Sequence, residues 1–581
     1  MKKLLLAGAS SLAIFALAPA MAQTVNNNST VTQTGTNGGA TVGQSGTNGI
    51  SVVTQGGNRN NATLTQAGNK NDSSIVQDNG TGSSDDSNTA IVVQSGSENI
   101  SKVSQTNDFS TARVTQSNFS NDSDVSQSGD LDVAEVRQSG QDNDSDLEQS
   151  GNLNTANVVQ SGNDNKSTLT QSSGLNEAIV TQSGNDNESK LTQTGVGAND
   201  ANILQSGNNN LSDVVQGGAG NGVGNSAAAG VQQLSDFNTA TVRQAGGLHE
   251  AFIQQKGGER NLATIDQGAN LSTDHTAAVR QDGIRNTANV TQRGFNENAD
   301  IRQTGETNIA EVDQGGAIGR DHDAFVTQGG NNNRANVLQR GNNQTANVTQ
   351  NGDGGLALVD QGEDSALGFL RGDNQAATIE QRTGGDNNTA RVEQRGDNQT
   401  AFILQVGSDN NGGNTRSVYG AEIRQGGITG RDNDARIEQL SGLNRAYIEQ
   451  QGVSLAAKVV QGGDGNHRSR IEQTGNGGSR NLNADVNQTG SSNESTITQS
   501  GTSQFALLTQ SGEENTSSVT QGGSGHSATV TQAGDFNESV VTQLTGSGNS
   551  ATVTQNSDFN ESFVTQSGTG MIATVTQGAP N

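Results

Sequence analysis

The chain of 581 residues has too few apolar side chains for the several globular domains that its length suggests. Hydrophobic residues make up 29% of the sequence and aromatic residues 3%, whereas Gly occurs 78 times. Pro occurs only twice, which is unlike a typical disordered chain, and the absence of Cys excludes disulfides and thiolate-bound zinc. The net charge of −27 argues against nucleic acid as a partner.

The first 22 residues have the pattern of a secretory signal peptide. Lys2 and Lys3 precede an apolar stretch, and Ala20-Met21-Ala22 has the small residues of a cleavage site at Ala20 and Ala22. We therefore expect a secreted protein. No later apolar run is long enough to span a membrane, so a membrane-spanning protein is not expected.

One pattern, [Ser/Ala]-x-[Val/Ile/Leu]-x-Gln, recurs 46 times along the rest of the chain. Of the 45 intervals between successive Gln residues of this pattern, 32 are 11 residues long. Asn is frequent six positions before the Gln, and Gly is frequent two positions after it. A spacing of two places all the recurring inner residues on one side of an extended strand. A helix is not indicated, because nothing recurs at three or four residues.

In chain order, the repeats fall into three segments after the signal peptide at 1–22. Residues 23–229 hold regular repeats in which the position four before each Gln alternates between Ser and Ala over 18 strands. Residues 230–465 hold irregular repeats with insertions, and Ala occupies this position from Ala240 to Ala457. Residues 466–581 return to regular repeats and to the alternation.

This alternation makes two strands, rather than one, the repeating unit. It predicts an all-β fold, a β-solenoid of two facing parallel sheets, with two strands and about 22 residues per rung and roughly 23 rungs. Ser is expected to stack in one sheet and Ala in the other. Gly, Asn and Asp are expected in the turns between strands, where left-handed backbone angles are least costly.

Identical inward side chains are expected to stack into ladders, as in cross-β assemblies. The expected Gln ladder includes Gln94, Gln105, Gln116, Gln127, Gln138, Gln149, Gln160, Gln171, Gln182 and Gln193. The expected Asn ladder includes Asn99, Asn121, Asn143, Asn154, Asn165 and Asn187. The inward aliphatic positions include Val158, Val180, Val530 and Val575.

The segment QSGNLNTANVVQ, residues 149–160, has Gly two, Asn five, Ala seven and the next Gln eleven positions after its first Gln. This pattern resembles the curlin repeat, the building unit of bacterial curli fibres, and the resemblance covers nearly all of the chain after the signal peptide. It implies an extracellular amyloid, a pilus-like fibre at the cell surface, used in biofilm matrix and adhesion. The chain is several times longer than a typical major curlin, so a main subunit, a nucleator and a cap all stay open.

The resemblance also implies the partners of the chain. These are further copies of itself, a curli-type nucleator, a dedicated export channel, periplasmic chaperones, and host or abiotic surfaces. No cofactor, metal site or enzymatic activity is expected, because no nucleophile–base–orienter set recurs and the Asp-rich turns lack the spacing of calcium loops. The segment Asp321-His322-Asp323 is expected in a surface loop, because the five His residues do not cluster in the sequence.

The main alternative is a monomeric β-solenoid that acts as an adhesin or an ice-binding protein. Pairs of outward Thr, such as Thr529 and Thr531, recur at successive Ala-type strands near the C-terminus. Charged residues such as Arg113 and Asp300 occupy the same outward positions elsewhere and interrupt a flat Thr array. These charges are expected to limit lateral aggregation and to keep unfolded chains apart during export.

The two ends of the solenoid are expected to present unpaired strand edges and to stack end to end, because no polar cap is evident. Proline in place of Val575 is expected to remove a backbone donor and to interrupt this edge.

Overall fold

The computed structural model describes residues 26–78, 87–195, 197–217, 227–268, 273–316, 319–362, 372–411, 419–426, 430–475 and 481–578. They belong to two compact units that divide between Arg285 and Asn286. Within the described ranges the regular secondary structure consists of β-strands, and none of these residues forms a helix that could cross a membrane.

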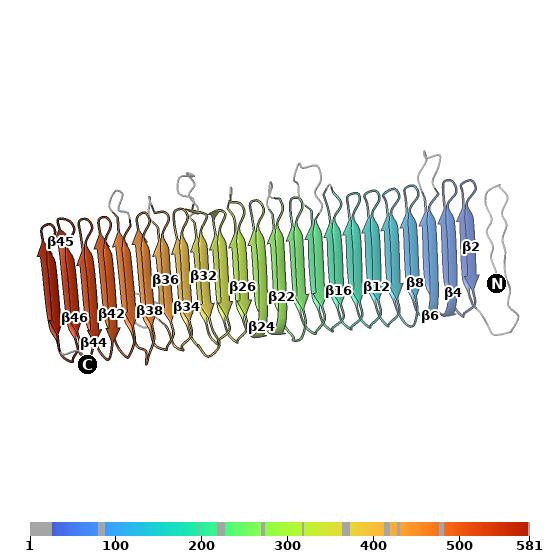
Figure 1. Ribbon diagram of the computed structural model, residues 1–581. Helices are drawn as coiled ribbons and strands as arrows, with labels where there is room; N and C mark the ends of the chain where they lie inside the picture. The colour runs from blue at the N-terminus through green and yellow to red at the C-terminus, as the bar shows by residue number, and fades with distance from the viewer. Residues whose placement is uncertain are drawn as a thin grey trace. The chain divides into compact units, whose positions relative to one another are not determined.

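The first unit contains β1 to β22, and its strands lie side by side with turns at both edges (Figure 1). One sheet consists of β1 (Asn28–Gln33), β3 (Ile50–Gln55), β5 (Asp72–Gln77), β7 (Ile100–Gln105), β9 (Asp122–Gln127), β11 (Asp144–Gln149), β13 (Lys166–Gln171), β15 (Glu188–Gln193), β17 (Leu211–Gln216), β19 (Thr239–Gln244) and β21 (Leu262–Gln267). The facing sheet consists of β2 (Gly39–Gln44), β4 (Asn61–Asn69), β6 (Thr89–Ser97), β8 (Thr111–Gln116), β10 (Val133–Gln138), β12 (Thr155–Gln160), β14 (Glu177–Gln182), β16 (Asp200–Gln205), β18 (Ala228–Gln233), β20 (Glu250–Gln255) and β22 (Thr276–Ile284).

The second unit contains β23 to β48 in the same arrangement. Strands equivalent to the first sheet are β23 (Thr287–Gln292), β25 (Ile309–Gln314), β27 (Arg334–Gln339), β30 (Leu356–Gln361), β33 (Thr389–Gln394), β35 (Ala421–Gln425), β37 (Arg445–Gln451), β39 (Arg468–Thr474), β41 (Glu494–Ser500), β43 (Thr516–Gln521), β45 (Glu538–Thr545) and β47 (Glu561–Ser567). Strands equivalent to the facing sheet are β24 (Asn298–Glu306), β26 (Asp323–Gln328), β29 (Thr345–Gln350), β32 (Ala376–Gln381), β34 (Thr400–Gln405), β36 (Asp434–Gln439), β38 (Ala456–Gln461), β40 (Asn483–Gln488), β42 (Phe505–Ser511), β44 (Ser527–Ala533), β46 (Ser550–Gln555) and β48 (Ile572–Gln577). Two short strands, β28 (Gly341–Asn342) and β31 (Gly372–Asp373), pair in the turns.

Sheet neighbours are parallel and align identical repeat positions. Between β12 and β14, for example, Ala156 pairs with Ala178, and Gln160 pairs with Gln182, which is 22 residues later. Counted over both units, 23 strands belong to each kind of sheet. The predicted β-solenoid of two parallel sheets, with two strands and about 22 residues per rung, is therefore confirmed.

The core lies between the two sheets and is made by the inward residues of each strand. Val158 and Val180 are both 0% exposed. Val159, whose side chain lies on the outward face of the sheet, is partly exposed. Ser145 pairs with Ser167 in the first sheet, while Ala156 and Ala178 pair in the facing sheet. The prediction that Ser and Ala stack in different sheets is confirmed for these regular repeats.

In most turns the residue seven positions before the ladder Gln is left-handed. Asp142 and Asp164 adopt this conformation with φ of 53° and 54°, but so do Leu153 and Leu175 with φ of 63° and 67°. The expected preference for Gly, Asn and Asp is therefore incomplete. Stacking supplies the reason: the backbone N–H of Leu175 donates to the carbonyl of Asn152 in the preceding rung at 3.0 Å, and this bond offsets the local strain.

Candidate functional site

The Gln ladder ties together both sheets and successive rungs. The side-chain Nε2 of Gln138 donates to Oε1 of Gln160 in the next rung at 2.8 Å, and also contacts the carbonyls of Asp122 at 2.7 Å and Asn143 at 3.1 Å. Both carbonyls belong to the chain around the facing sheet. The ten Gln residues expected in this ladder are all buried, with at most 1% exposed. Each buried amide thus has partners, which a buried polar group requires.

The Gln ladder has a direction along the chain. Nε2 of Gln116 donates to Oε1 of Gln138, and Nε2 of Gln160 donates to Oε1 of Gln182, so donors face the following rung. The orientation of each amide is fixed, because its nitrogen also contacts backbone carbonyls, which only accept hydrogen bonds. Oε1 therefore faces the preceding rung throughout these residues.

The Asn ladder runs along the corner where each strand begins. Nδ2 of Asn143 donates to Oδ1 of Asn121 at 2.9 Å and to the carbonyl of Gly162 at 2.8 Å. The backbone N–H of Asn165 also donates to Oδ1 of Asn143 at 3.1 Å. The six expected ladder Asn residues are at most 1% exposed. In this ladder Oδ1 accepts from the following rung, opposite to the direction of the Gln ladder.

The same corner position, six residues before a ladder Gln, also holds ionisable residues that the sequence analysis missed. All five His residues occupy it, and each is at most 1% exposed: His249, His275, His322, His467 and His526. The expectation that His322 lies in a surface loop is wrong, because stacked turns cover this corner. Each His lies six residues before a ladder Gln, as the expected ladder Asn residues do, and this spacing could have predicted the burial of the His residues from the sequence. The rings of His249 and His275 stack at 4.8 Å with an interplanar angle of 4°.

Burial at this corner shifts the titration of these groups. Desolvation lowers the pKa of His275 to about 3, with a smaller contribution from neighbouring His249. Desolvation likewise lowers the pKa of His322 to about 4, although Asp321 acts in the opposite sense. Glu297 occupies the same position, and desolvation, with help from the charge of Asp321, raises its pKa to about 9. These residues are therefore neutral at pH 7.

We expect acid to weaken the packing around His322. Its folded-state pKa of about 4 lies below the ordinary value of 6.5, so stability is lost as pH falls from about 6.5 towards 4. Replacing His322 with Asn, the usual residue at this corner, should reduce that loss. Denaturant unfolding of the soluble protein at pH 7.5 and pH 4.5 measures the difference, and the outward Thr327→Asn is the matched control. An unchanged acid loss in His322→Asn would contradict this assignment.

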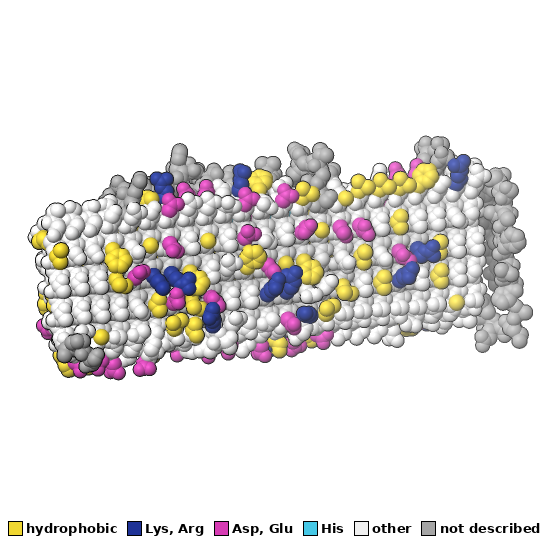
Figure 2. Space-filling model, viewed as in Figure 1, with side chains coloured by type: hydrophobic (Ala, Val, Ile, Leu, Met, Phe, Trp, Pro, Cys, Tyr) yellow, Lys and Arg dark blue, Asp and Glu magenta, His cyan; other side chains and the backbone are white. Residues whose placement is uncertain are grey.

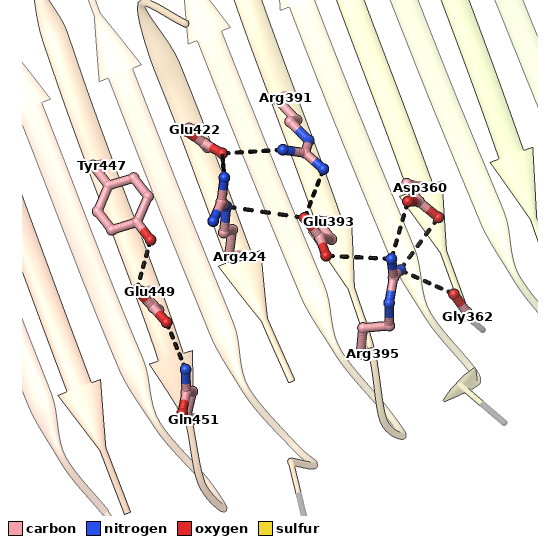
Figure 3. Close-up of polar contacts among 10 residues, drawn as sticks. All are labelled: Asp360, Gly362, Arg391, Glu393, Arg395, Glu422, Arg424, Tyr447, Glu449 and Gln451. Carbon is pink, nitrogen blue, oxygen red and sulfur yellow. Dashed lines mark hydrogen bonds and ion pairs between the residues drawn. The ribbon is translucent and has the colours of Figure 1, made fainter. Parts of the chain in front are cut away.

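The outward face of the second unit carries a connected group of charges on β30, β33 and β35 (Figure 3). Arg391 contacts Glu393 at 2.7 Å and Glu422 on the next strand at 3.5 Å. Arg424 contacts Glu422 at 2.7 Å, and Arg395 contacts Glu393 at 3.2 Å. These outward charges neutralise one another across strands. Networks of this kind stabilise more than isolated surface pairs.

Other parts of the outward surface are uncharged. Figure 2 shows charged side chains in separate groups on the visible face, with polar, uncharged surface over the strands near the C-terminus. Outward Thr residues of β44, β46 and β48 stack in register there, as Thr529, Thr552 and Thr574 do. On the other sheet, Thr542 of β45 pairs with Thr565 of β47.

The first and last strands present incompletely paired edges. Among the described residues, β1 and β2 pair only with β3 and β4, and β47 and β48 pair only with β45 and β46. Val575, which was expected to be an inward core residue, is partly exposed because no described rung follows it. Val530, in β44 two rungs before β48, is 0% exposed. We define β1 and β2 as the head edge, and β47 and β48 as the tail edge.

The backbone of β48 shows which groups are free. The carbonyl of Gln577 accepts a hydrogen bond from the N–H of Asn556, which follows β46. Alternate residues of a parallel strand direct their N–H and carbonyl groups to the same neighbouring strand, so Gln577 and the residues two and four before it direct these groups towards β46. Val575 is one of these. The expectation that Val575→Pro removes a donor from the open edge is therefore wrong. Thr574 and Thr576 direct their N–H groups away from β46 instead.

Fold and side-chain geometry together define a tandem-repeat β-solenoid held by amide ladders. Ten segments match the family model of the curlin associated repeat: residues 52–78, 120–151, 140–172, 168–195, 285–316, 294–329, 385–411, 478–512, 505–534 and 527–556. The chain is a curlin-associated repeat protein, and the resemblance seen in the sequence is confirmed. A search among curated proteins gave no match. Ala20 and Ala22, the expected cleavage site, lie outside the described residues.

Proposed function

We propose that this protein is a secreted structural subunit that polymerises into curli-like amyloid fibres at the cell surface. Its repeats and its solenoid fold fit a curli-type structural protein. The observation that carries the proposal is the pair of incompletely paired edges, because an unpaired strand edge is a template for another chain. The role that we propose is adhesion and biofilm matrix, without enzymatic activity.

The chemistry of the ladders supports polymerisation. Every ladder described above continues by repetition of one rung, so a further copy adds the same Gln, Asn and aliphatic contacts that hold the interior. The outward Thr32 of β1 and Thr565 of β47 are uncharged, so these two positions do not repel a second copy. We propose that a nucleator, an export channel and periplasmic chaperones of curli type assist assembly, and that host or abiotic surfaces are the adhesion targets.

The chain lacking residues 1–22 should convert at micromolar concentration into Thioflavin T-positive fibres. Their strands should give a meridional spacing of about 4.7–4.8 Å, because rungs stack along the fibre. Electron microscopy, fibre diffraction and Thioflavin T fluorescence, followed over days, measure the conversion. A chain that stays folded and monomeric throughout would contradict the proposal.

A monomeric ice-binding or adhesive solenoid is the second candidate function. The in-register Thr columns of β44, β46 and β48, with Thr531, Thr554 and Thr576 as one column, favour it. Inhibition of ice recrystallisation by the soluble monomer would support this function. Replacing Thr554 with Lys should then abolish the inhibition, whereas fibre formation should be unaffected by this outward change.

A further inference from the structure

The outward face of the first unit has a hollow that neither the amide ladders nor the strand edges use. It lies on the facing sheet, over β16, β18, β20 and β22, which are neighbours in the sheet between the labels β16 and β22 of Figure 1. Its volume is about 420 Å³, which is within the range of small-molecule sites, and it is open to solvent. All the residues that line it belong to the first unit.

Small side chains in the middle of the sheet make this hollow. Ala228 and Gly230 are outward residues of β18, and Ala278 is outward on β22. Ala and Gly are poor strand formers, and a Gly inside a strand often marks a place where a ligand or another chain approaches closely. The sequence of β18 therefore sacrifices strand stability at the place where the surface is hollowed.

The ring of Phe252 on β20 forms an apolar wall of the hollow. Gly230 pairs with Phe252, and a Cβ atom at Gly230 would lie 3.1 Å from Cδ2 of the ring, so the ring leans over the glycine. Arg280 of β22 lies over the same ring, with its Cζ atom 5.6 Å from the ring centroid. The ring is therefore held between two strands and is still partly exposed, which leaves apolar surface for a ligand.

Polar groups that can bind hydroxyls surround this ring. The exposed carboxylates of Asp200 and Glu250 lie where β16 and β20 begin, and the exposed amide of Asn202 lies beside Gly230. Arg280 lies towards the other end of the strands. Carboxylates accept hydrogen bonds, an amide donates and accepts them, and a guanidinium only donates. The rim therefore suits a ligand whose groups both donate and accept.

A sugar ring has the properties that this hollow requires. One face of a pyranose consists of C–H groups, which pack on the electron-rich face of an aromatic ring, and the hydroxyls at its edge donate and accept hydrogen bonds. A shallow hollow suits such a flat ligand. The two carboxylates, with a single guanidinium, disfavour a ligand that carries carboxylates or sulfates. The charge of the rim therefore favours a neutral sugar.

We propose that this hollow binds a neutral oligosaccharide, with one sugar ring on Phe252 and hydroxyls on Asp200, Asn202, Glu250 and Arg280. The inference goes beyond the proposed polymerisation and does not rest on it, because the residues of the site belong to β16, β18, β20 and β22 and not to the first or last strands.

Cellotetraose, a neutral tetrasaccharide of glucose, is the probe. The soluble chain lacking residues 1–22 should bind it with a dissociation constant on the order of 1 mM, because the ligand stays partly in solvent. Saturation-transfer NMR titrations measure the affinity. Phe252→Ala should weaken binding roughly tenfold, because the ring supplies most of the apolar contact. The control is Phe325→Ala, which removes another outward Phe, 39% exposed on β26, and should leave the affinity unchanged.

Filling the hollow gives a second test that keeps the aromatic ring. Gly230→Thr adds a side chain that favours strands and occupies the space beside Phe252, so binding should again fall roughly tenfold. Gly43→Thr is the matched control, because it adds the same side chain on the outward side of β2, where no atom of the described residues lies within 4 Å of an added Cβ. Circular dichroism and denaturant unfolding check that all the variants fold.

The charge of the ligand distinguishes a sugar site from a site for a basic peptide. Asp200→Asn combined with Glu250→Gln keeps oxygen acceptors and removes both charges, so the affinity for cellotetraose should change by less than about threefold. The affinity for a tetramer of glucuronic acid should rise roughly fivefold in this double variant at low salt, because the repulsion is removed.

Each outcome supports or overturns the proposal. Absence of cellotetraose binding by the unmodified chain would overturn it, and so would equal binding by Phe252→Ala and Gly230→Thr. Binding of tetralysine without binding of cellotetraose, lost in the double charge variant, would overturn it in favour of a basic peptide. None of these results bears on fibre formation, which electron microscopy of the same chain tests separately.

Discussion

Replacing Val158 with Asp should lower the free energy of unfolding by several kcal/mol, because the new carboxylate is buried between the sheets. Val158 is 0% exposed, and its neighbours along the ladder are Val136 and Val180, both also 0% exposed. None of these aliphatic neighbours offers a hydrogen bond or an opposite charge. An unpaired charge in such a site has no compensation for its lost hydration.

The matched control is the adjacent residue. Val159→Asp places the same carboxylate on the outward side of β12, where Val159 is partly exposed. The free energy of unfolding should therefore change by less than about 0.5 kcal/mol. Chemical denaturation of the soluble chain measures the total change. Hydrogen exchange should locate the loss of protection in β10, β12 and β14, because solenoid rungs contact mainly their neighbours. Similar losses in both variants would show that the inward and outward faces are assigned wrongly.

Replacing Glu297 with Gln should stabilise the second unit at alkaline pH. Burial raises the pKa of Glu297 from an ordinary 4.5 to about 9, so the unfolded chain releases a proton above pH 4.5 that the folded chain keeps. Stability is therefore lost as pH rises from about 4.5 towards 9. Gln already occupies the same corner position at Gln344 and Gln375, where Nε2 of Gln344 donates to the carbonyl of Gly372 at 2.7 Å. The substitution therefore fits the fold.

The size of this effect follows from the pKa shift. At pH 8 the gain should be on the order of 5 kcal/mol, and it should shrink to near zero at pH 4.5. Denaturant unfolding across this pH range measures the gain in the free energy of unfolding. Hydrogen exchange should show increased protection in β24, next to the substituted residue. The control Asn298→Gln changes the next, partly exposed residue and should leave the pH dependence as it is. A destabilised Glu297→Gln protein at pH 8 would show that the carboxylate is ionised and needed in the fold.

The sequence by itself determined the strands, their inward faces and their partners. A period of two fixes which side chains share a face, and the 22-residue alternation of Ser and Ala fixes which strands are sheet neighbours. Val158, Gln160 and Asn154 were assigned inward on this basis, and the structure buries all three. The reason is that a solenoid repeats one local solution, so each rung carries the information for its own placement.

Only the tertiary structure decided what happens where neighbouring rungs meet. The burial of His322 and Glu297 depends on turns that stack above and below them. Their six-residue spacing to a ladder Gln is that of the buried Asn residues, but their ionisable side chains argued against burial, because a buried charge without a partner is costly. Arg391 and Glu422 are 31 residues apart, across an insertion, so their pairing needed the register of β33 and β35. The direction of the amide ladders was also undetermined by sequence, because a Gln can face either neighbour until fixed carbonyls such as that of Asp122 accept from its nitrogen.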